Sequence, residues 1–362
     1  MITEIEVKNF KTLRDVKIPL APGITVMVGA NNSGKSNALA VLKLLAQGER
    51  QKDFRAAIEA LGGMQSLRAR EAVHGVEISL HVKTQYIGRY SREKLDYRCE
   101  YEWRLDGTLS RRLRYEDRNY DSPREIDYQD PREIWSEPHQ ESVKQLSEFL
   151  GESAIHDLSI AALRAPAVVR QDVQLGPDGR DAAAVLDALA GESPSLRDAI
   201  DETVRRTAHE VKRVVTRPGP TPGTKVLGIE EKDGRVYGAE DTSDGLLLFI
   251  GLAIAAQRKV QTPRILAIEE PERGIHPRRL RDLVDHLLSL TKSGVQIVLT
   301  THSPTLLDEF RDSPESVLIF DRDEKGTHIT RLSDRPDWAK DLKGAPLGEL
   351  WYSGVLGGVP GR

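Results

Sequence analysis

The sequence predicts an α/β fold whose core is a mainly parallel sheet, and three observations lead to this fold class. A buried-strand pattern at 24–28 runs through a glycine-rich loop into a helix pattern at 37–45. Apolar strands at 265–268 and 295–300 are each followed by a helix that starts at a proline, so strands and helices alternate as they do in parallel sheets. Alternating apolar and polar residues within 76–103 indicate an antiparallel β insertion instead of a further strand–helix unit.

The glycine-rich loop at 29–36 reads Gly-Ala-Asn-Asn-Ser-Gly-Lys-Ser, which has the glycines, lysine and hydroxyl of a phosphate-binding loop at the required offsets. Its two glycines allow a close backbone approach that a Cβ would block. Lys35 can reach the β- and γ-phosphates, and the Ser36 hydroxyl can hold Mg²⁺. A glycine turn before an ordinary helix is the alternative, which the flanking strand and helix disfavour. We expect the phosphates of a nucleotide to contact Asn31, Asn32, Ser33, Gly34, Lys35, Ser36 and Asn37.

Composition limits the class of protein. A hydrophobic content of 39% in 362 residues is enough for a sizeable core. No apolar run approaches the ~20 residues that span a bilayer, and the N-terminus lacks the pattern of a signal peptide. The single cysteine, Cys99, excludes an internal disulfide framework and a cysteine-based metal cluster. We therefore expect a cytoplasmic protein with no membrane partner.

The formal net charge of −4 argues against a generally basic nucleic-acid binder. Basic residues still gather locally, at Arg111, Arg112 and Arg114, at Arg205, Arg206, Lys212 and Arg213, and at Arg278, Arg279 and Arg281. Solvated helix or strand faces explain such groups equally well, so charge alone gives only a weak indication of DNA contact.

The middle of the chain predicts a mixed lobe. Residues 116–140 contain three prolines and no helix or strand period, which indicates a long surface segment. The elements expected next are a helix at 141–150, a strand at 158–163, helices at 181–190 and 195–214, and a Pro/Gly-rich turn at 217–223.

A serine stands at the N-cap position of the apolar helix predicted at 246–253. This residue is Ser243, within the segment Asp241-Thr242-Ser243-Asp244-Gly245. Its hydroxyl and the positive end of the helix dipole would face outward together. The segment is therefore a potential anion-binding surface.

Acidic residues and a histidine follow two of the predicted core strands. Glu269 and Glu270 come at the end of one strand, and His302 follows the next. Hydrolysis of a phosphoanhydride needs a phosphate cradle, a metal, an oriented water and positive potential at the γ-phosphate. Glu269 would hold the hydration shell of Mg²⁺, Glu270 would accept the proton of the attacking water, and His302 could contact the γ-phosphate beside Lys35. A surface turn and a capped helix are the alternatives, which their order after a good phosphate loop disfavours.

Five motifs in order carry a resemblance to a known family. They are Asn9-Phe10-Lys11, the loop at 29–36, the segment at 241–245, the acidic run through Gly274-Ile275-His276-Pro277, and Thr301-His302-Ser303-Pro304. This set, with the tail at 347–354, resembles the ABC-type ATPase heads of the SMC and RecF-like group. The resemblance is to the compact branch without a long coiled coil, related to the heads of overcoming-lysogenization-defect nucleases. It implies a P-loop NTPase with ABC-ATPase head architecture, comprising a mainly parallel core sheet, an antiparallel β insertion and a helical lobe.

The resemblance also implies domain limits and a dimer. The head would cover 1–332, with a nucleotide-binding core at 1–115 and 225–332 and an inserted lobe at 116–224, followed by a tail at 333–362. In such heads Lys11 would contact the nucleotide. Ser243 and Gly245 of one subunit would close over ATP and Mg²⁺ held by the phosphate loop of the other.

The sequence departs from the family pattern at two places, and the family's metal-contacting glutamine is not obvious. The 241–245 segment lacks the second glycine and following glutamine of transporter ATPases, which disfavours a transporter subunit. Glu269 stands where an aspartate is usual, which could weaken metal binding. For the metal-contacting glutamine, Gln171 after the predicted strand at 158–163 is the better candidate and Gln65 the weaker one.

Three functions are compatible with these features. The leading one is an ATP-switched homodimer that controls a DNA-directed process, repair or anti-phage defence, through a separate effector. A second is a nuclease, for which Asp321, Asp323 and Glu324 are candidate acids, but only residues 327–362 follow their hairpin, too few for a further catalytic domain. A transporter ATPase is the third.

Overall fold

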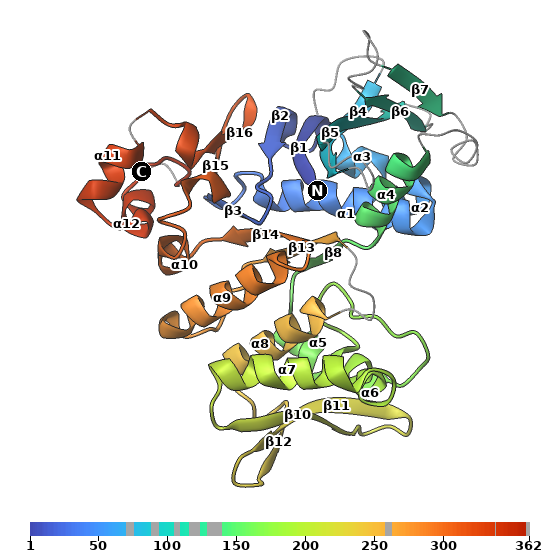
Figure 1. Ribbon diagram of the computed structural model, residues 1–362, viewed down its shortest axis with the longest axis vertical. Helices are drawn as coiled ribbons and strands as arrows, with labels where there is room; N and C mark the ends of the chain where they lie inside the picture. The colour runs from blue at the N-terminus through green and yellow to red at the C-terminus, as the bar shows by residue number, and fades with distance from the viewer. Residues whose placement is uncertain are drawn as a thin grey trace.

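The fold is described from a computed structural model in which residues 1–69, 76–87, 94–104, 109–115, 124–128, 140–257, 263–336 and 338–359 are described. Three β-sheets and the helices that pack on them make up this part of the chain (Figure 1). Among these residues, none of the helices combines the length and apolar character needed to cross a membrane.

The core sheet has six strands in the order β16-β15-β3-β14-β13-β8. Their bounds are β3 (Ile24–Gly29), β8 (Ala154–His156), β13 (Arg264–Glu269), β14 (Val295–Thr301), β15 (Val317–Asp323) and β16 (Gly326–Arg331). All pairs are parallel except β15 with β16, which confirms the predicted mainly parallel sheet. The carboxyl ends of five strands therefore meet at one edge, where the glycine-rich loop follows β3.

Helices cover both faces of the core sheet. Helix α1 (Lys35–Gln51) packs on one face with Met27 of β3, while α8 (Asp244–Ala256) and α9 (Leu280–Thr291) pack on the other with Val26 and Val28. Successive side chains of a strand point to opposite faces, so β3 contributes to two separate hydrophobic clusters. Figure 1 shows α1 above β14, β13 and β8 of the core sheet, and α8 and α9 below these strands.

An antiparallel sheet lies against α1 and confirms the predicted β insertion. Its order is β2-β1-β4-β5-β6-β7. Its strands are β1 (Ile2–Phe10), β2 (Leu13–Pro19), β4 (Val76–Ile87), β5 (Lys94–Arg104), β6 (Leu109–Tyr115) and β7 (Arg124–Tyr128). The helices beside it are α2 (Phe54–Ala60), α3 (Met64–Leu67) and α4 (Gln140–Gly151). Strand β7 lies within 116–140, where the sequence predicted no strand. Its residues form a strand because they pair with β6.

The third sheet and three helices form the lobe at the other end of the molecule (Figure 1). Its strands are β9 (Ala167–Val168), β10 (Val211–Pro218), β11 (Thr224–Glu231) and β12 (Val236–Gly238). Its helices are α5 (Ile160–Arg164), α6 (Ala182–Glu192) and α7 (Pro194–Thr207). Strands β11 and β12 pair as an antiparallel hairpin.

Two predicted elements in this lobe are wrong. The strand expected at 158–163 is helix α5, and the core strand is β8, a few residues earlier. The periodicity of a short apolar run does not distinguish a helix from a strand. Here the tertiary contact of Leu163 in α5 with Gly251 of α8 accompanies the helix. The helix expected at 195–214 ends at Thr207, because the following residues pair with β11 as strand β10.

The C-terminal segment packs back onto the core. It contains α10 (Pro304–Asp308), α11 (Trp338–Gly344) and α12 (Leu347–Tyr352). The Gly348 N–H of α12 donates to Asp308 Oδ1 at 2.7 Å. Helix α4 and strand β8 fall inside the range given to the inserted lobe, yet β8 pairs with β13 of the core sheet. The division at 115, 225 and 332 stays a prediction.

Candidate nucleotide-binding and hydrolysis site

The loop between β3 and α1 has the backbone of an anion cradle. Asn32 and Gly34 have positive φ values of 64° and 113°, and α1 begins without a side-chain cap. A Cβ on Gly29 would lie 2.3 Å from Phe320 O, and one on Gly34 would lie 2.4 Å from Thr327 Oγ1, so both positions need glycine. The buried Ser33 hydroxyl has no hydrogen-bond partner among the described residues. The loop therefore fits phosphate oxygens.

Lys35 is held inside this loop. Its Nζ donates to Gly29 O at 2.7 Å and to Ala30 O at 2.9 Å, and the residue is only 5% exposed. Burial lowers the pKa of the Lys35 ammonium to about 8, while the carboxylates of Glu270 and Glu269 oppose this shift. A bound phosphate would add a negative partner to a cation that burial disfavours.

Ser36 and Glu269 lie together although they are far apart in sequence. The Ser36 hydroxyl donates to Glu269 Oε1 at 2.5 Å. The longer side chain of glutamate therefore reaches the hydroxyl at the position where the family usually has aspartate. A hydroxyl and a carboxylate at the mouth of a phosphate loop are the oxygen donors that Mg²⁺ prefers, so these residues fit that ion.

Glu270 begins the loop after β13 in an unusual conformation. Its φ of 45° lies in the left-handed region, which a non-glycine residue adopts rarely and most often at functional sites. The N–H of Glu270 donates to Thr300 O at 3.1 Å. Its carboxylate oxygens lie 3.6 Å from His302 Nε2 and 3.6 Å from Arg273 Nε. The expected base and histidine are thus brought together, and Arg273 joins them without having been predicted.

His302 follows β14 directly and precedes Ser303, which caps α10. Burial and then the charge of Lys35 lower the pKa of His302, against the opposing effect of Glu270. The imidazole is therefore mainly neutral at pH 7. One of its ring nitrogens can then donate a hydrogen bond while the other accepts one.

The turn between β1 and β2 carries Lys11 to the side of the phosphate loop. Thr12 Oγ1 in this turn accepts from Asn37 Nδ2 at 2.7 Å. Thr327 Oγ1 lies 2.9 Å from both Thr12 Oγ1 and Ser33 O. The Asn37 side chain therefore holds the turn in place, and its contact with a nucleotide, like that of Lys11, stays a prediction. Local sequence gives no signal for Thr327, because it comes from β16.

Ser243 caps α8 as predicted. Its Oγ accepts from the Leu246 N–H at 3.4 Å, and the residue is exposed. Arg164 holds the same segment by donating to Thr242 O at 3.2 Å and to Asp244 Oδ1 at 2.8 Å. Helices α8 and α1 pack on opposite faces of the core sheet (Figure 1). Ser243, at the start of α8, therefore lies on the other side of this sheet from α1, which begins at Lys35.

The two candidate glutamines lie in other elements. Gln171 is exposed in a turn after β9, and Gln65 lies in α3. The carboxyl end of β8, next to β13, carries Asp157 instead, which forms an ion pair with Arg273. Sequence reasoning missed Asp157 because it expected the strand at 158–163. A metal contact from either glutamine stays a prediction.

Two of the three acids proposed for a nuclease, Asp321 and Asp323, form hydrogen bonds or ion pairs within the β15–β16 hairpin, and Glu324 is exposed at its tip. Asp323 Oδ1 lies 2.9 Å from His328 Nε2 and accepts from the Lys325 N–H at 2.7 Å. Asp321 Oδ1 accepts from the Arg322 N–H at 2.8 Å. These contacts belong to a β-hairpin tip.

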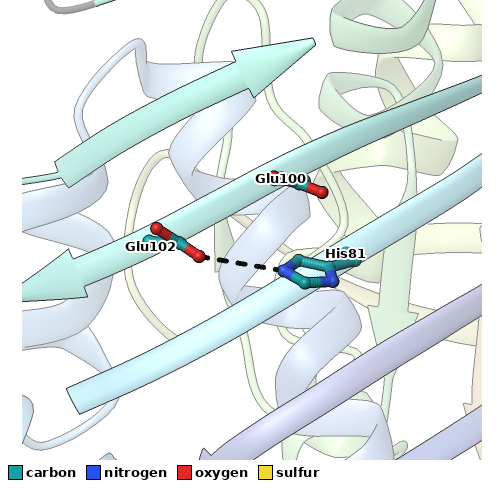
Figure 2. Close-up of side chains that lie close together, drawn as sticks. All are labelled: His81, Glu100 and Glu102. Atoms are coloured by element: carbon teal, nitrogen blue, oxygen red, sulfur yellow. Dashed lines mark ion pairs between the residues drawn. The ribbon is translucent and has the colours of Figure 1, made fainter. Parts of the chain in front are cut away.

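One group in the described part of the chain has the spacing of metal ligands, and it lies in the antiparallel sheet. It consists of His81 on β4 with Glu100 and Glu102 on β5 (Figure 2). Arg98 Nε lies 3.1 Å from Glu100 Oε1, and Arg98 also contacts His81. Arg98 already balances the charge of Glu100, and His81 Nε2 lies 3.9 Å from Glu102 Oε1, so we assign no metal to this group.

Taken together, the sheets and helices form the fold of an ABC-type ATPase head of the SMC and RecF-like group. The family model "AAA domain, putative AbiEii toxin, Type IV TA system" matches residues 24–308. The chain belongs to this family.

Relatives and solved structures agree with that class. The chain is 22% identical over 357 residues to the DNA replication and repair protein RecF of Heliobacterium modesticaldum, covering 83% of this chain and 92% of RecF. A solved Smc head bound to the C-winged helix domain of ScpA superposes with a TM-score of 0.59 at 15% identity, covering 91% of this chain and 97% of that one. A Pyrococcus furiosus Smc head with an extended coiled coil, bound to the ScpA C-terminal domain, gives 0.52 at 13%, covering 94% and 99%. A relation to overcoming-lysogenization-defect heads stays a prediction.

Proposed function

We propose that this protein binds and hydrolyses ATP as a head that dimerises around the nucleotide. The observation that carries this proposal is the meeting of three strand ends at one place. Ser36 contacts Glu269, and Glu270 lies 3.6 Å from His302, all beside the buried Lys35. These are the parts that phosphoryl transfer to water needs.

Each residue has a role in this mechanism. Lys35 and the backbone N–H groups of the loop bind the phosphates and stabilise the charge that grows on them. Glu270 accepts the proton of the attacking water, and the neutral imidazole of His302 contacts the γ-phosphate. Mg²⁺, held by Ser36 and Glu269, would supply positive charge to the β- and γ-phosphates when bound.

The dimer follows from a second anion-binding surface. Ser243 is exposed at the start of α8, on the opposite face of the core sheet from α1. Ser243 Oγ already accepts from the Leu246 N–H, so its own O–H can donate to a phosphate oxygen at this helix N-terminus. In our proposal it binds the γ-phosphate of ATP held by a second copy of the chain, so each site is completed across the interface.

We further propose that this dimer controls a DNA-directed process through a separate effector. The printed function of the RecF relative supports DNA repair, and the family description, which names a toxin system, supports a role in defence. The Smc heads that share the fold are bound to a separate protein, ScpA, which supports an effector partner. Adding duplex DNA should therefore change the rate of ATP turnover, and an unchanged rate would remove DNA from the proposal.

Substitution of the base tests hydrolysis. Glu270→Gln should keep the affinity for ATP but lower turnover about 100-fold or more, because an amide keeps the shape yet cannot take a proton. Phosphate release and equilibrium binding of ATP measure the two quantities. Glu309→Gln, at an exposed position after α10, is the matched control. Turnover at the wild-type rate in Glu270→Gln would place the base elsewhere.

A further inference from the structure

The carboxyl of Glu272 joins the ends of two neighbouring core strands. Glu272 lies in the loop after β13, three residues beyond Glu269. Its Oε1 accepts from Thr301 Oγ1 at 2.7 Å and from the His302 N–H at 3.2 Å. One oxygen therefore holds both the last residue of β14 and the histidine that follows it.

This contact is costly to keep buried. Thr301 is fully buried, and Glu272 Oε2 is buried with no hydrogen-bond partner among the described residues. Burial raises the pKa of Glu272, although its hydrogen bonds act in the opposite direction. A buried carboxyl that leaves one oxygen unpaired lowers the free energy of unfolding. An apolar pair at these positions would avoid that cost, so stability does not account for the arrangement.

The contact instead fixes the distance between Glu270 and His302, whose side chains lie 3.6 Å apart. Glu270 and Glu272 belong to the same loop. His302 follows the neighbouring strand β14, and its backbone N–H donates to Glu272. Thr301 Oγ1 in turn accepts from the Ser303 N–H at 2.9 Å, which carries the restraint into the cap of α10. The chain on both sides of His302 is thus tied to the loop that carries the base.

We propose that Glu272 is a positioning residue that, through Thr301 and the His302 backbone, holds the imidazole at its working distance from Glu270. The inference rests on the proposed ATP hydrolysis and adds a residue to it. Glu272 acts on His302 and not on the phosphates. Its loss therefore changes turnover and leaves nucleotide affinity almost unchanged.

Thr301 offers the cleanest variants, because valine has the shape of threonine without the hydroxyl. Thr301→Val and Glu272→Ala should each lower kcat about 10- to 100-fold, the range for a displaced catalytic group, with the Kd for ATP unchanged within about twofold. Thr301→Ser keeps the hydroxyl and should retain most of the turnover. Exposed controls on the same segment are Thr305→Val and Glu309→Ala.

A second background separates positioning from general damage. If Glu272 acts through His302, adding Glu272→Ala or Thr301→Val to His302→Ala should lower kcat no further. Additive losses in that background would overturn the proposal. So would wild-type kcat in both single variants. Should Glu272→Ala fail to fold, the Thr301 variants carry the test alone.

A readout without ATP keeps this test independent of the proposed function. The pKa of His302 is lowered by burial and by Lys35 and raised by Glu270. Releasing the imidazole from its half-buried position in Thr301→Val should move the pKa of His302 upward. NMR titration follows this pKa on a resonance assigned with His302→Ala. An unmoved pKa contradicts the positioning role, whereas absent ATP turnover in the wild type contradicts only the proposed function.

Discussion

At the scale of single residues, Lys35 links the fold to the chemistry. Two carbonyls of the loop hold its ammonium in a position that burial makes unfavourable for a charge. Lys35→Ala should weaken ATP binding about 10- to 100-fold, since a charge-assisted hydrogen bond contributes about 1.5–3 kcal/mol. Isothermal titration measures this loss, and Lys43→Ala, on the same helix, is the control. Equal affinity in wild type and Lys35→Ala would refute the phosphate-loop assignment.

His286 gives the fold a dependence on pH. This residue of α9 packs against Phe249 of α8, with ring centroids 6.2 Å apart. Burial, assisted by the charge of Arg206, lowers the pKa of His286 to about 4. The unfolded chain, with a histidine pKa near ~6.5, therefore binds the proton more readily. The contribution of this residue to stability is complete above about pH 6.5 and is lost as pH falls toward 4.

His286→Leu removes this titration. Its melting temperature should fall less than that of the wild type between pH 7 and pH 5, as followed by circular dichroism. His209, at an exposed position in the turn after α7, supplies the control variant His209→Leu. The same pH dependence in wild type and His286→Leu would exclude this histidine as its source.

At the scale of elements, the sequence predicted best where a functional residue directly follows a strand. The loop after β3, the acids at the end of β13 and the histidine after β14 are each local signals, and parallel pairing brings them to one edge. Contacts between distant segments left no local signal. Thr327 of β16 contacts Ser33 in the phosphate loop. Arg273 forms an ion pair with Asp157, which follows β8, and the sequence predicted this strand at 158–163 instead.

Period alone also failed where tertiary pairing decided the structure. Val211 and Val214 continue the three-to-four spacing of α7, yet they lie in β10 because β11 supplies their hydrogen bonds. Gln171 was assigned from a strand that the chain does not form there. The structure of a segment that can form either helix or sheet hydrogen bonds is therefore harder to predict than that of a glycine-rich loop, which has one favoured conformation.

Gly245 fixes how closely α8 approaches the loop after β13. A Cβ at this position would lie 2.2 Å from Gly274 O, a backbone atom that cannot move alone. Gly245→Ala should therefore lower the free energy of unfolding by about 1–3 kcal/mol, measured by urea denaturation. Gly191→Ala in α6 is the matched control, since nothing lies within 4 Å of its Cβ. Equal stability in both variants would show that the contact relaxes without cost.

At the scale of the whole molecule, the two proposed anion-binding surfaces lie on opposite sides of one sheet. The phosphate loop opens at the start of α1, and Ser243 starts α8 on the other face. A single nucleotide within one chain cannot use both. Two copies arranged head to tail can use all four surfaces, two from each copy. Each bound ATP would then stabilise the dimer by roughly RT ln(1 + [L]/Kd).

The molecular mass of Glu270→Gln with ATP and Mg²⁺, measured by light scattering, tests this account most directly. The base variant retains ATP, so we expect a dimer with the nucleotide and a monomer without it. If the subunits already associate without nucleotide, the distance between heads, measured with spin labels, replaces mass as the readout. Adding Ser243→Arg should reduce this closure while ATP stays bound. ATP-bound Glu270→Gln heads that neither associate nor close, or closure unaffected by Ser243→Arg, would contradict the account.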